Sequence, residues 1–342
     1  MKAVVFHEHG GIETLSYQDV PTPKPGPGEV LIKLRAAALN HLDIWVRQGL
    51  PGMKLAFPHI GGSDGAGEIA EVGEGVRALE KGQRVVVSPC LSCGQCSECL
   101  DGRDNLCPDF RLFGLQVPGT YAEYLVAPAR SVFPVSDALG FEEWAAVPLV
   151  FLTSWNMLAT TGRLEAGETV LIHAAGSGIG SAAIVIAKHL GARVITTAGS
   201  DWKLEKARAL GADETINYTK EDFAPRAKQL TDGAGVDLIF EHIGPPTWPG
   251  DLACLAKGGR MVVCGATGGP RVELDVAPFY RRQLSIHGCY LGTRGDLEQV
   301  LELVEQGALR PVVDTVFPLK EAAAAQQKML DRDFFGKLVL RM

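Results

Sequence analysis

The stretch from Thr169 to Gly180 constrains the fold more than any other part of this 342-residue chain. The apolar run TVLIH predicts a strand, the small residues AAGSGIG predict a tight turn, and the following SAAIVIAKHL predicts a helix. Such a turn lets backbone approach a pyrophosphate, whose charge the amides at the helix start bind. Ala175 and Ser177 replace the first two glycines of a strict G-x-G-x-x-G motif, but the context favours a dinucleotide site over a plain turn. The expected contacts are Gly176, Ser177, Gly178, Ile179 and Gly180.

Strands and helices alternate beyond this point, in ETVLIHAA, SAAIVIAKHLGA, RVITTAG, DWKLEKARALGA, VDLIFEHIG and GGRMVVCGA. Alternation with apolar strands predicts a doubly wound parallel sheet covered on both faces. Residues 1–130 instead read as short strands separated by Pro and Gly, which is typical of a barrel-like β domain. Between them, EEWAAVPLVFLTSWNMLAT is a long helix-compatible run that carries Pro148. The closing segment FGKLVLRM predicts a strand that returns to the β-rich part.

A chain of this length exceeds what one hydrophobic core sustains, so we expect two domains in an α/β protein. The expected boundaries are 1–150 with 290–342 for the β-rich domain and 151–289 for the dinucleotide-binding domain. The net charge of −7 argues against nucleic acid as a partner, because phosphate binding needs a basic face. No uninterrupted apolar run reaches transmembrane length and no secretory leader is visible, so we expect a cytoplasmic protein without a membrane partner.

Four cysteines are spaced as in a closed tetrathiolate zinc site, with two x2 intervals and one x7 interval. Tetrahedral zinc is held by four thiolates, and a set filled by protein has no open position for substrate, so the ion is structural. Disulfides are the alternative, but they are uncommon in a protein without a secretory leader. We expect one structural Zn²⁺ in the lobe 90–107, held by Cys93, Cys96, Cys99 and Cys107. Cys90 is a spare thiol or an alternative ligand, and Cys254, Cys264 and Cys289 are expected to be small buried hydrophobes.

The choice of dinucleotide depends on the end of the second strand, where a carboxylate would bind the ribose hydroxyls of NAD. That strand ends in Ala198-Gly199-Ser200, so NADP(H) is favoured and NAD(H) stays possible, since a loop shift could bring Asp201 to the ribose. Candidates for the 2′-phosphate are Ser200, Lys203 and Tyr218. His242 follows a later strand at the edge where ligands bind, although a structural role is open for it. Gly265, in the turn after the next strand, is a candidate for the nicotinamide carboxamide.

Several motifs together resemble the medium-chain dehydrogenase/reductase superfamily, which holds the zinc alcohol dehydrogenases and their quinone reductase relatives. They are PGPGEVLIKL, the region Asn40 to Asp43, GGSDGAG at 61–67, the cysteine lobe, the glycine turn and ARALGADETINY. The resemblance covers nearly the whole chain. It implies a GroES-like catalytic domain interrupted by a Rossmann domain, hydride transfer, and a homodimer or homotetramer.

The chain departs from this superfamily's alcohol dehydrogenases at the catalytic zinc site. The alcohol dehydrogenases of that superfamily hold a catalytic zinc, and its ligand positions fall on Asn40, Ser63 and the neighbourhood of Leu149 or Val150 in this chain. None of these is a zinc ligand, and a catalytic zinc needs three protein ligands. His41 and Asp64 survive nearby, and the family's equivalents orient ligands or pass protons. His59 is expected at the surface or as a capping residue.

Without a Lewis acid, a conjugated carbonyl or quinone is the easier hydride acceptor, because its negative charge spreads over an enolate or hydroquinone. Hydrogen-bond donors then stabilise the anion, and our candidate donors are Asn40, Thr153 and His41. Asp43 and Asp64 complete the set of expected catalytic residues. His41 is also the candidate proton donor, or equally a cofactor-ribose contact. We expect an NADPH-dependent reductase acting on a small carbonyl or quinone. The alternatives are an alcohol dehydrogenase with a rebuilt metal site that uses His41, His59 or Asp64, and a non-catalytic NADPH-binding sensor.

Overall fold

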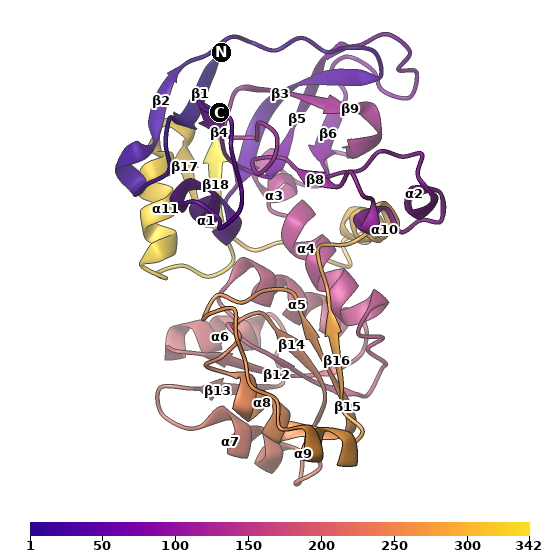
Figure 1. The fold of residues 1–342 in the computed structure, drawn as a ribbon, viewed down its shortest axis with the longest axis vertical. Helices are drawn as coiled ribbons and strands as arrows, with labels where there is room; N and C mark the ends of the chain where they lie inside the picture. The colour runs from indigo at the N-terminus through magenta and orange to yellow at the C-terminus, as the bar shows by residue number, and fades with distance from the viewer. The chain divides into compact units, whose positions relative to one another are not determined.

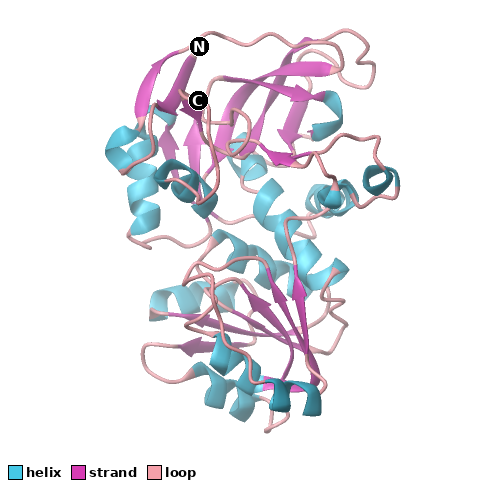
Figure 2. Cartoon of the chain, viewed as in Figure 1, coloured by secondary structure: helices cyan, strands magenta, loops and turns pink.

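The computed structural model describes residues 1–342, which fold into two compact units. The first comprises residues 1–150, 293–306 and 311–342, and the second comprises 151–292 and 307–310. Figure 1 labels their elements, and Figure 2 shows that strands dominate the first unit while helices and strands alternate in the second. None of the helices combines the length and apolar character needed to cross a bilayer.

The first unit is built around a seven-stranded sheet in the order β10-β6-β5-β3-β18-β17, with β9 also paired to β3. Its longest strands, β3 and β5, run antiparallel with two register shifts, and Gly67 lets the backbones approach at one of them. The closing strand β18 pairs with β3, as predicted for the tail. The strands are β3 (Glu29–Ala38), β5 (Asp64–Val72), β6 (Arg84–Val87), β9 (Tyr124–Pro128), β10 (Val132–Pro134), β17 (Val313–Pro318) and β18 (Lys337–Arg341).

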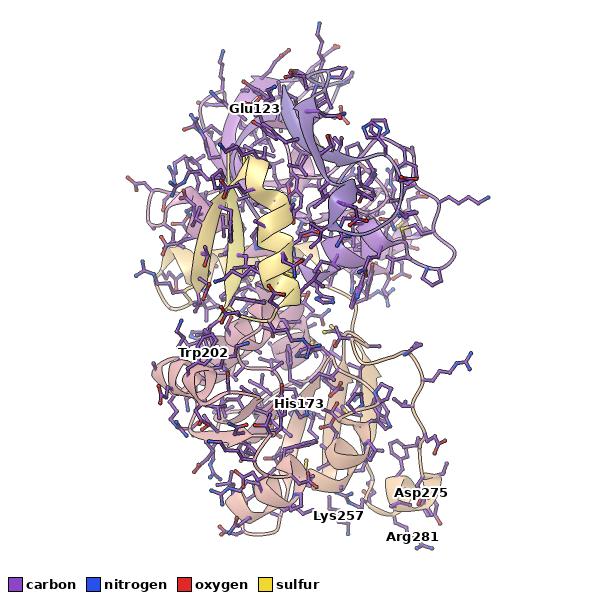
Figure 3. All side chains as sticks on the ribbon, turned by 90° about the vertical axis from the view of Figure 1, so that its left-hand side faces the viewer. Glu123, His173, Trp202, Lys257, Asp275 and Arg281 are labelled. Carbon is purple, nitrogen blue, oxygen red and sulfur yellow. The ribbon has the colours of Figure 1, made fainter.

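Smaller elements complete the first unit. Strands β1 (Lys2–Phe6), β2 (Ser16–Asp19) and β4 (His59–Ile60) form a three-stranded sheet, and β7 (Cys90–Leu91) pairs with β8 (Arg111–Leu112). The Lys2 backbone N–H donates to the Glu123 carboxylate at 2.7 Å, a residue labelled in Figure 3. The helices are α1 (His41–Gln48), α2 (Ser97–Leu100), α3 (Phe141–Ala145), α10 (Arg294–Glu305) and α11 (Ala322–Leu330).

The second unit is a parallel sheet in the order β13-β12-β11-β14-β15-β16, which confirms the predicted doubly wound α/β architecture. The order reverses between β11 and β14, the position at which open α/β sheets bind ligands. Its strands are β11 (Thr169–Ile172), β12 (Arg193–Ala198), β13 (Glu214–Asn217), β14 (Val236–Glu241), β15 (Leu255–Val263) and β16 (Ser285–Gly288). Its helices are α5 (Gly178–His189), α6 (Asp201–Ala209), α7 (Phe223–Leu230), α8 (Trp248–Cys254) and α9 (Val276–Arg281).

The apolar run around Pro148 is not one helix. α3 ends at Ala145, α4 (Pro148–Trp155) begins at the proline, and residues 156–160 form a π-helical turn. Proline has no N–H to donate and disfavours helical backbone in the residue before it, so it opens a helix instead of continuing one. The break leaves the first amides of α4 available to other acceptors.

Candidate functional site

The glycine turn after β11 leaves no room for a larger side chain at Gly180. A Cβ on Gly180 would lie 2.3 Å from the carbonyl oxygen of Ala174, so any larger residue there would collide with backbone. The Ser177 hydroxyl accepts the Gly180 N–H at 2.9 Å and caps α5. Ala174 has φ +53°, which tightens the turn from strand to helix. The backbone therefore has the compact form that a pyrophosphate needs at a helix start.

The predicted 2′-phosphate contacts gather beside this turn. A Cβ on Gly176 would lie 2.8 Å from Cδ of Lys203, so the lysine stem lies against the glycine turn. A Cβ on Gly199 would lie 2.7 Å from the Tyr218 hydroxyl. Ser200 precedes α6 in extended conformation at its N-cap. The end of β12 is thus lined by a cation and hydroxyl groups.

Asp201, the residue that would favour NAD, is engaged elsewhere. Its carboxylate accepts the Asn217 amide at 2.7 Å and pairs with Lys220 at 2.6 Å. The hydrogen bond to Lys220, followed by that to Asn217, lowers the pKa of Asp201. Moving this carboxylate to a ribose would break both contacts.

A buried histidine–carboxylate cluster lies at the carboxyl edge of the same sheet, and sequence reasoning missed it. His173 follows β11, Glu241 ends β14 and Asp251 lies in α8; Figure 3 labels His173 within the second unit. The imidazole Nε2 lies 2.7 Å from Asp251 and 3.9 Å from Glu241, and its Nδ1 lies 3.1 Å from the Thr197 hydroxyl. The sequence did contain a signal for this cluster, because a histidine follows β11 and a glutamate ends β14. These strands are neighbours in the parallel sheet, so their carboxyl ends lie together.

Burial governs the charge of this cluster. Desolvation raises the pKa of Glu241 and that of Asp251 to about 7 each, and it lowers the pKa of His173 to about 4. Glu241 accepts the backbone N–H groups of Ile243 and Gly244. A proton on Glu241 or Asp251 lets these two carboxyl groups hydrogen-bond to each other. The two carboxyl groups therefore hold protons that free carboxylates would lose.

The remaining predicted cofactor residues lie close together at this edge. His242 Nε2 lies 3.3 Å from the carbonyl oxygen of His173, and burial lowers the pKa of the His242 ring. A Cβ on Gly265 would lie 3.2 Å from the His242 carbonyl oxygen. The ends of β14 and β15 are thus in contact beside the switch point of the sheet.

In the first unit, three predicted residues form a buried polar network around a lysine that sequence reasoning missed. The Lys337 ammonium donates to the carbonyl of Leu39 at 2.7 Å, to Asn40 Oδ1 at 2.7 Å and to Asp64 at 3.1 Å. Asn40 Nδ2 donates to the same Asp64 oxygen at 2.9 Å. Because an ammonium has only donors, it fixes the Asn40 oxygen toward itself and the amide nitrogen toward Asp64. A lysine inside the apolar run of the closing strand was the signal for this role.

Asp64 and Asp43 have different partners in this network. The other Asp64 oxygen accepts the backbone N–H of Leu149 at 2.8 Å, in the first turn of α4. Asp43 Oδ2 accepts the Tyr121 hydroxyl at 2.6 Å and the Asn40 N–H at 2.8 Å. Burial raises the pKa of Asp43 to about 6 against these bonds. Asp43 thus holds the start of α1 and contacts Asn40 through its backbone.

Other predicted residues lie outside the network. His41 is exposed and rests edge-on against Trp45, with ring centroids 4.9 Å apart; partial desolvation, then the charge of Arg332, lowers its pKa. Thr153 is buried in α4, in the second unit. The expectation that His59 lies at the surface is wrong. His59 is 5 % exposed, because β4 pairs with β1. Its Nε2 lies 3.0 Å from the Gly114 carbonyl oxygen, and its ring packs edge-on against Phe6 of β1.

The four predicted zinc ligands converge. Their sulfur atoms all lie within 4.8 Å of one another, and those of Cys93 and Cys99 are 3.9 Å apart. Four bonds of 2.3 Å in a tetrahedron place sulfur atoms about 3.8 Å apart, so the set fits zinc. Cys90 is buried outside the group.

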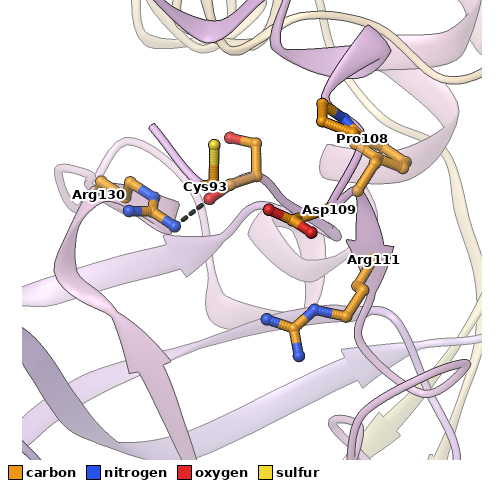
Figure 4. A pocket seen from close by; sticks show the side chains of 7 residues that line it. Cys93, Pro108, Asp109, Arg111 and Arg130 are labelled. Carbon is orange, nitrogen blue, oxygen red and sulfur yellow. Dashed lines mark hydrogen bonds between the residues drawn. The ribbon is translucent and has the colours of Figure 1, made fainter. Parts of the chain in front are cut away.

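A hollow of about 520 Å³ lies beside the lobe (Figure 4). Cys93 and Arg130 form part of its wall, and Arg130 donates to the carbonyl of Ser92. The other lining residues are Pro108, Asp109, Phe110 and Arg111. The hollow contains none of the residues of the Asn40–Asp64–Lys337 network.

Comparisons with known proteins agree with the folds of both units. Residues 26–137 match the alcohol dehydrogenase GroES-like domain, and residues 178–306 match the zinc-binding dehydrogenase domain. A zinc-type alcohol dehydrogenase-like protein of Schizosaccharomyces pombe is 34% identical over 100% of the chain and 99% of its own length. A quinone oxidoreductase of Pseudomonas aeruginosa is 33% identical, with 99% of each sequence covered. A solved structure described as an NAD-dependent alcohol dehydrogenase is 47% identical, with a TM-score of 0.97 over the full length of both chains.

Replacing a lobe cysteine is expected to cost metal and stability. Cys93→Ser removes one of four thiolates, so zinc content should fall from about one per chain towards zero and the melting temperature should drop. Metal analysis and thermal unfolding measure the two effects. Cys90→Ser makes the same chemical change outside the set and should keep its zinc. If Cys93→Ser kept its zinc and melting temperature, the lobe would not be a structural metal site.

The carboxyl pair in the second unit predicts a pH-dependent stability. Both folded pKa values are raised to about 7, so this stabilisation is present at low pH and is lost as pH rises through 7. The lowered pKa of His173 has the opposite effect and makes the free energy of unfolding rise with pH, but only below the ordinary pKa of histidine. Between pH 6.5 and 8 the free energy of unfolding should therefore fall by about 1 kcal/mol.

Glu241→Gln, which mimics the protonated acid, should flatten that slope in urea titrations. Glu205→Gln, an exposed carboxyl of the same unit, is the control and should keep the wild-type slope. Equal slopes in all three proteins would contradict proton uptake by the pair.

Proposed function

Because the chain belongs to the medium-chain dehydrogenase/reductase superfamily and is an NAD(P)-dependent oxidoreductase, we propose that it transfers a hydride from NADPH to a quinone or α,β-unsaturated carbonyl without a catalytic zinc. The observation that carries this proposal is that both carboxylate oxygens of Asp64 already accept hydrogen bonds. Its two oxygens accept the Asn40 amide, the Lys337 ammonium and the Leu149 N–H. A divalent cation at this carboxylate would meet the charge of an ammonium 3.1 Å away from it.

The other positions that would ligate zinc support the same reading. Ser63 is fully buried and its hydroxyl donates to the Phe113 carbonyl at 2.8 Å. The Asn40 oxygen accepts from Lys337. Each candidate ligand atom therefore has a partner of its own, and reorganising all of them would leave buried polar groups unpaired.

The proposed chemistry assigns separate tasks to the chain's residues. Bound NADPH supplies the hydride. One amide hydrogen of Asn40 is held by Asp64, and the second is the donor we assign to the developing enolate or hydroquinone oxygen. Lys337 and Asp43 are positioning residues, the first fixing the side chain of Asn40 and the second its backbone. Thr153 is a further candidate donor.

His41 is the proposed proton donor to the product. Its exposure lets it exchange protons with water, and its lowered pKa means that the cationic form declines at a lower pH than for a free histidine. The protonation of the product should therefore slow as pH rises above the lowered pKa of His41.

The preference for NADPH rests on the end of β12. The strand ends without a carboxylate, Lys203 and Tyr218 line the edge, and Asp201 is held by Asn217 and Lys220. The solved relative described as NAD-dependent keeps NADH as the alternative cofactor. We place the protein in the cytoplasm, where the four thiols stay reduced and can hold a metal.

Activity against a panel tests the function. NADPH oxidation should proceed with quinones and enals and should be at least tenfold slower with saturated ketones, because only the conjugated acceptors spread the charge. Metal analysis of the same sample should give about one zinc per chain. About two zinc ions with turnover of simple alcohols would instead establish an alcohol dehydrogenase with a rebuilt site. Tight NADPH binding without turnover on the whole panel would identify a sensor.

Lys203 provides a test of the cofactor preference. Lys203→Ala should raise KM for NADPH about tenfold and leave KM for NADH unchanged, since a partly exposed charge-assisted bond to phosphate contributes about 1.5 kcal/mol. Lys206→Ala is the matched control and also removes one positive charge. The Nζ atoms of Lys203 and Lys206 lie 5.3 and 5.2 Å from the centroid of the Trp202 ring. Equal effects of the two variants would remove Lys203 from the phosphate site.

We also propose that the chain forms a homo-oligomer through the β16 edge of its parallel sheet. Exposed apolar side chains are frequent in the segment 272–290, which includes α9 and this edge strand: Val272, Leu274, Val276, Tyr280 and Tyr290. Val276→Glu combined with Tyr280→Glu should convert an oligomer into monomers in light scattering, while secondary structure is unchanged. A wild-type chain that is monomeric at micromolar concentration would exclude this interface.

A further inference from the structure

Two cysteines end adjacent strands of the parallel sheet. The register of β15 and β16 pairs Val263 with Gly288, and the next residue on each strand is a cysteine, Cys264 and Cys289. Backbone hydrogen bonds continue to both of them, from Cys289 N–H to the Val263 carbonyl at 2.8 Å and from Cys264 N–H to the Glu241 carbonyl at 3.1 Å. The pair is therefore held in register one residue beyond the last paired residues of β15 and β16.

The register also places both thiols on one face. Met261 and Ile286 are a registered pair that packs in the core cluster on one side of the sheet. Side chains alternate along a strand, so Cys264 and Cys289, each three residues further on, share the opposite face. Neighbouring strands are about 4.8 Å apart, and a disulfide joins residues whose α-carbons are about 4.4–6.8 Å apart. The strand spacing is therefore compatible with a bond between these cysteines, which forms when the Cys289 thiol turns from the Leu291 carbonyl towards Cys264.

The two groups also interact electrostatically. The pKa of the Cys264 thiol is raised well above its ordinary value, first by burial and then by Cys289. Cys289 lies between Gly288 and Tyr290 directly after the edge strand, and its thiol donates to the Leu291 carbonyl at 3.6 Å.

We propose that Cys264 and Cys289 are a redox pair that forms a reversible intramolecular disulfide at the ligand-binding edge of the second unit. A hydroperoxide is the oxidant. The Cys289 thiolate attacks one peroxide oxygen, the O–O bond breaks, and a sulfenic acid and hydroxide form from hydrogen peroxide. The Cys264 thiolate then attacks the Cys289 sulfur, so that the S–S bond forms and the S–O bond breaks with loss of a second hydroxide. Each hydroxide takes up the proton that one thiol released on ionising, which gives two waters in total. A dithiol restores both thiols and is itself oxidised to its disulfide.

Direct chemical mapping tests the proposal and requires no enzymatic turnover, so it is independent of the proposed function. The zinc-loaded full chain is treated with hydrogen peroxide at pH 8.5, where the thiolate fractions are larger, and free thiols are then alkylated. Tryptic digestion without reduction should give residues 261–271 linked to residues 283–294. Dithiothreitol should separate the two peptides, and Cys289→Ser should abolish the link.

Two controls make the result decisive. Cys254, fully buried in the core of the same unit, should remain a free thiol and become alkylated only after unfolding. A mixture of ¹⁵N-labelled and unlabelled protein should give only peptide pairs of like isotope, since the bond is within one chain. Mixed isotope pairs, irreversible oxidation of Cys289 without a link, or links to other cysteines would each overturn the proposal.

Discussion

The buried ammonium of Lys337 is the constraint on which the first unit's candidate site depends. A charge with a 3% exposed side chain is tolerated only when it is paired and its hydrogens are all accepted. Here the acceptors are a backbone carbonyl, an amide oxygen and a carboxylate. The same three contacts fix the amide of Asn40 and one oxygen of Asp64. The lysine comes from the closing strand β18, so the C-terminal part of the chain completes a site that begins at residue 40.

The second unit uses burial in a different way. His173, Glu241 and Asp251 have no lysine or arginine among their contacts, so protons compensate the carboxylates. This cluster lies under the edge that carries the glycine turn, His242 and Gly265. The sheet edge proposed to hold the cofactor is therefore supported by a network whose charge changes near neutral pH.

Much of the fold was readable because its signals are local. Strand-turn-helix periodicity predicted the parallel sheet, and the spacing of four cysteines predicted a cluster that the structure does form. The run around Pro148 shows the limit of periodicity, since its apolar pattern is continuous while proline divides the helix. His59 shows another limit, because a histidine near a strand start gives no sign of which strand and loop will pack against it.

The sequence by itself determined which chemical groups are present. They are a glycine turn, a second strand that ends without an acidic residue, four zinc-type thiols, and Asn40 and Ser63 where zinc ligands would stand. The tertiary structure alone decided the partners of these groups. Lys337 is 273 residues from Asp64, and Asp251 is 78 from His173, so no local pattern relates them. Strand pairing and burial brought them together, and burial then set their protonation, because only the folded chain removes the water that would otherwise solvate each charge.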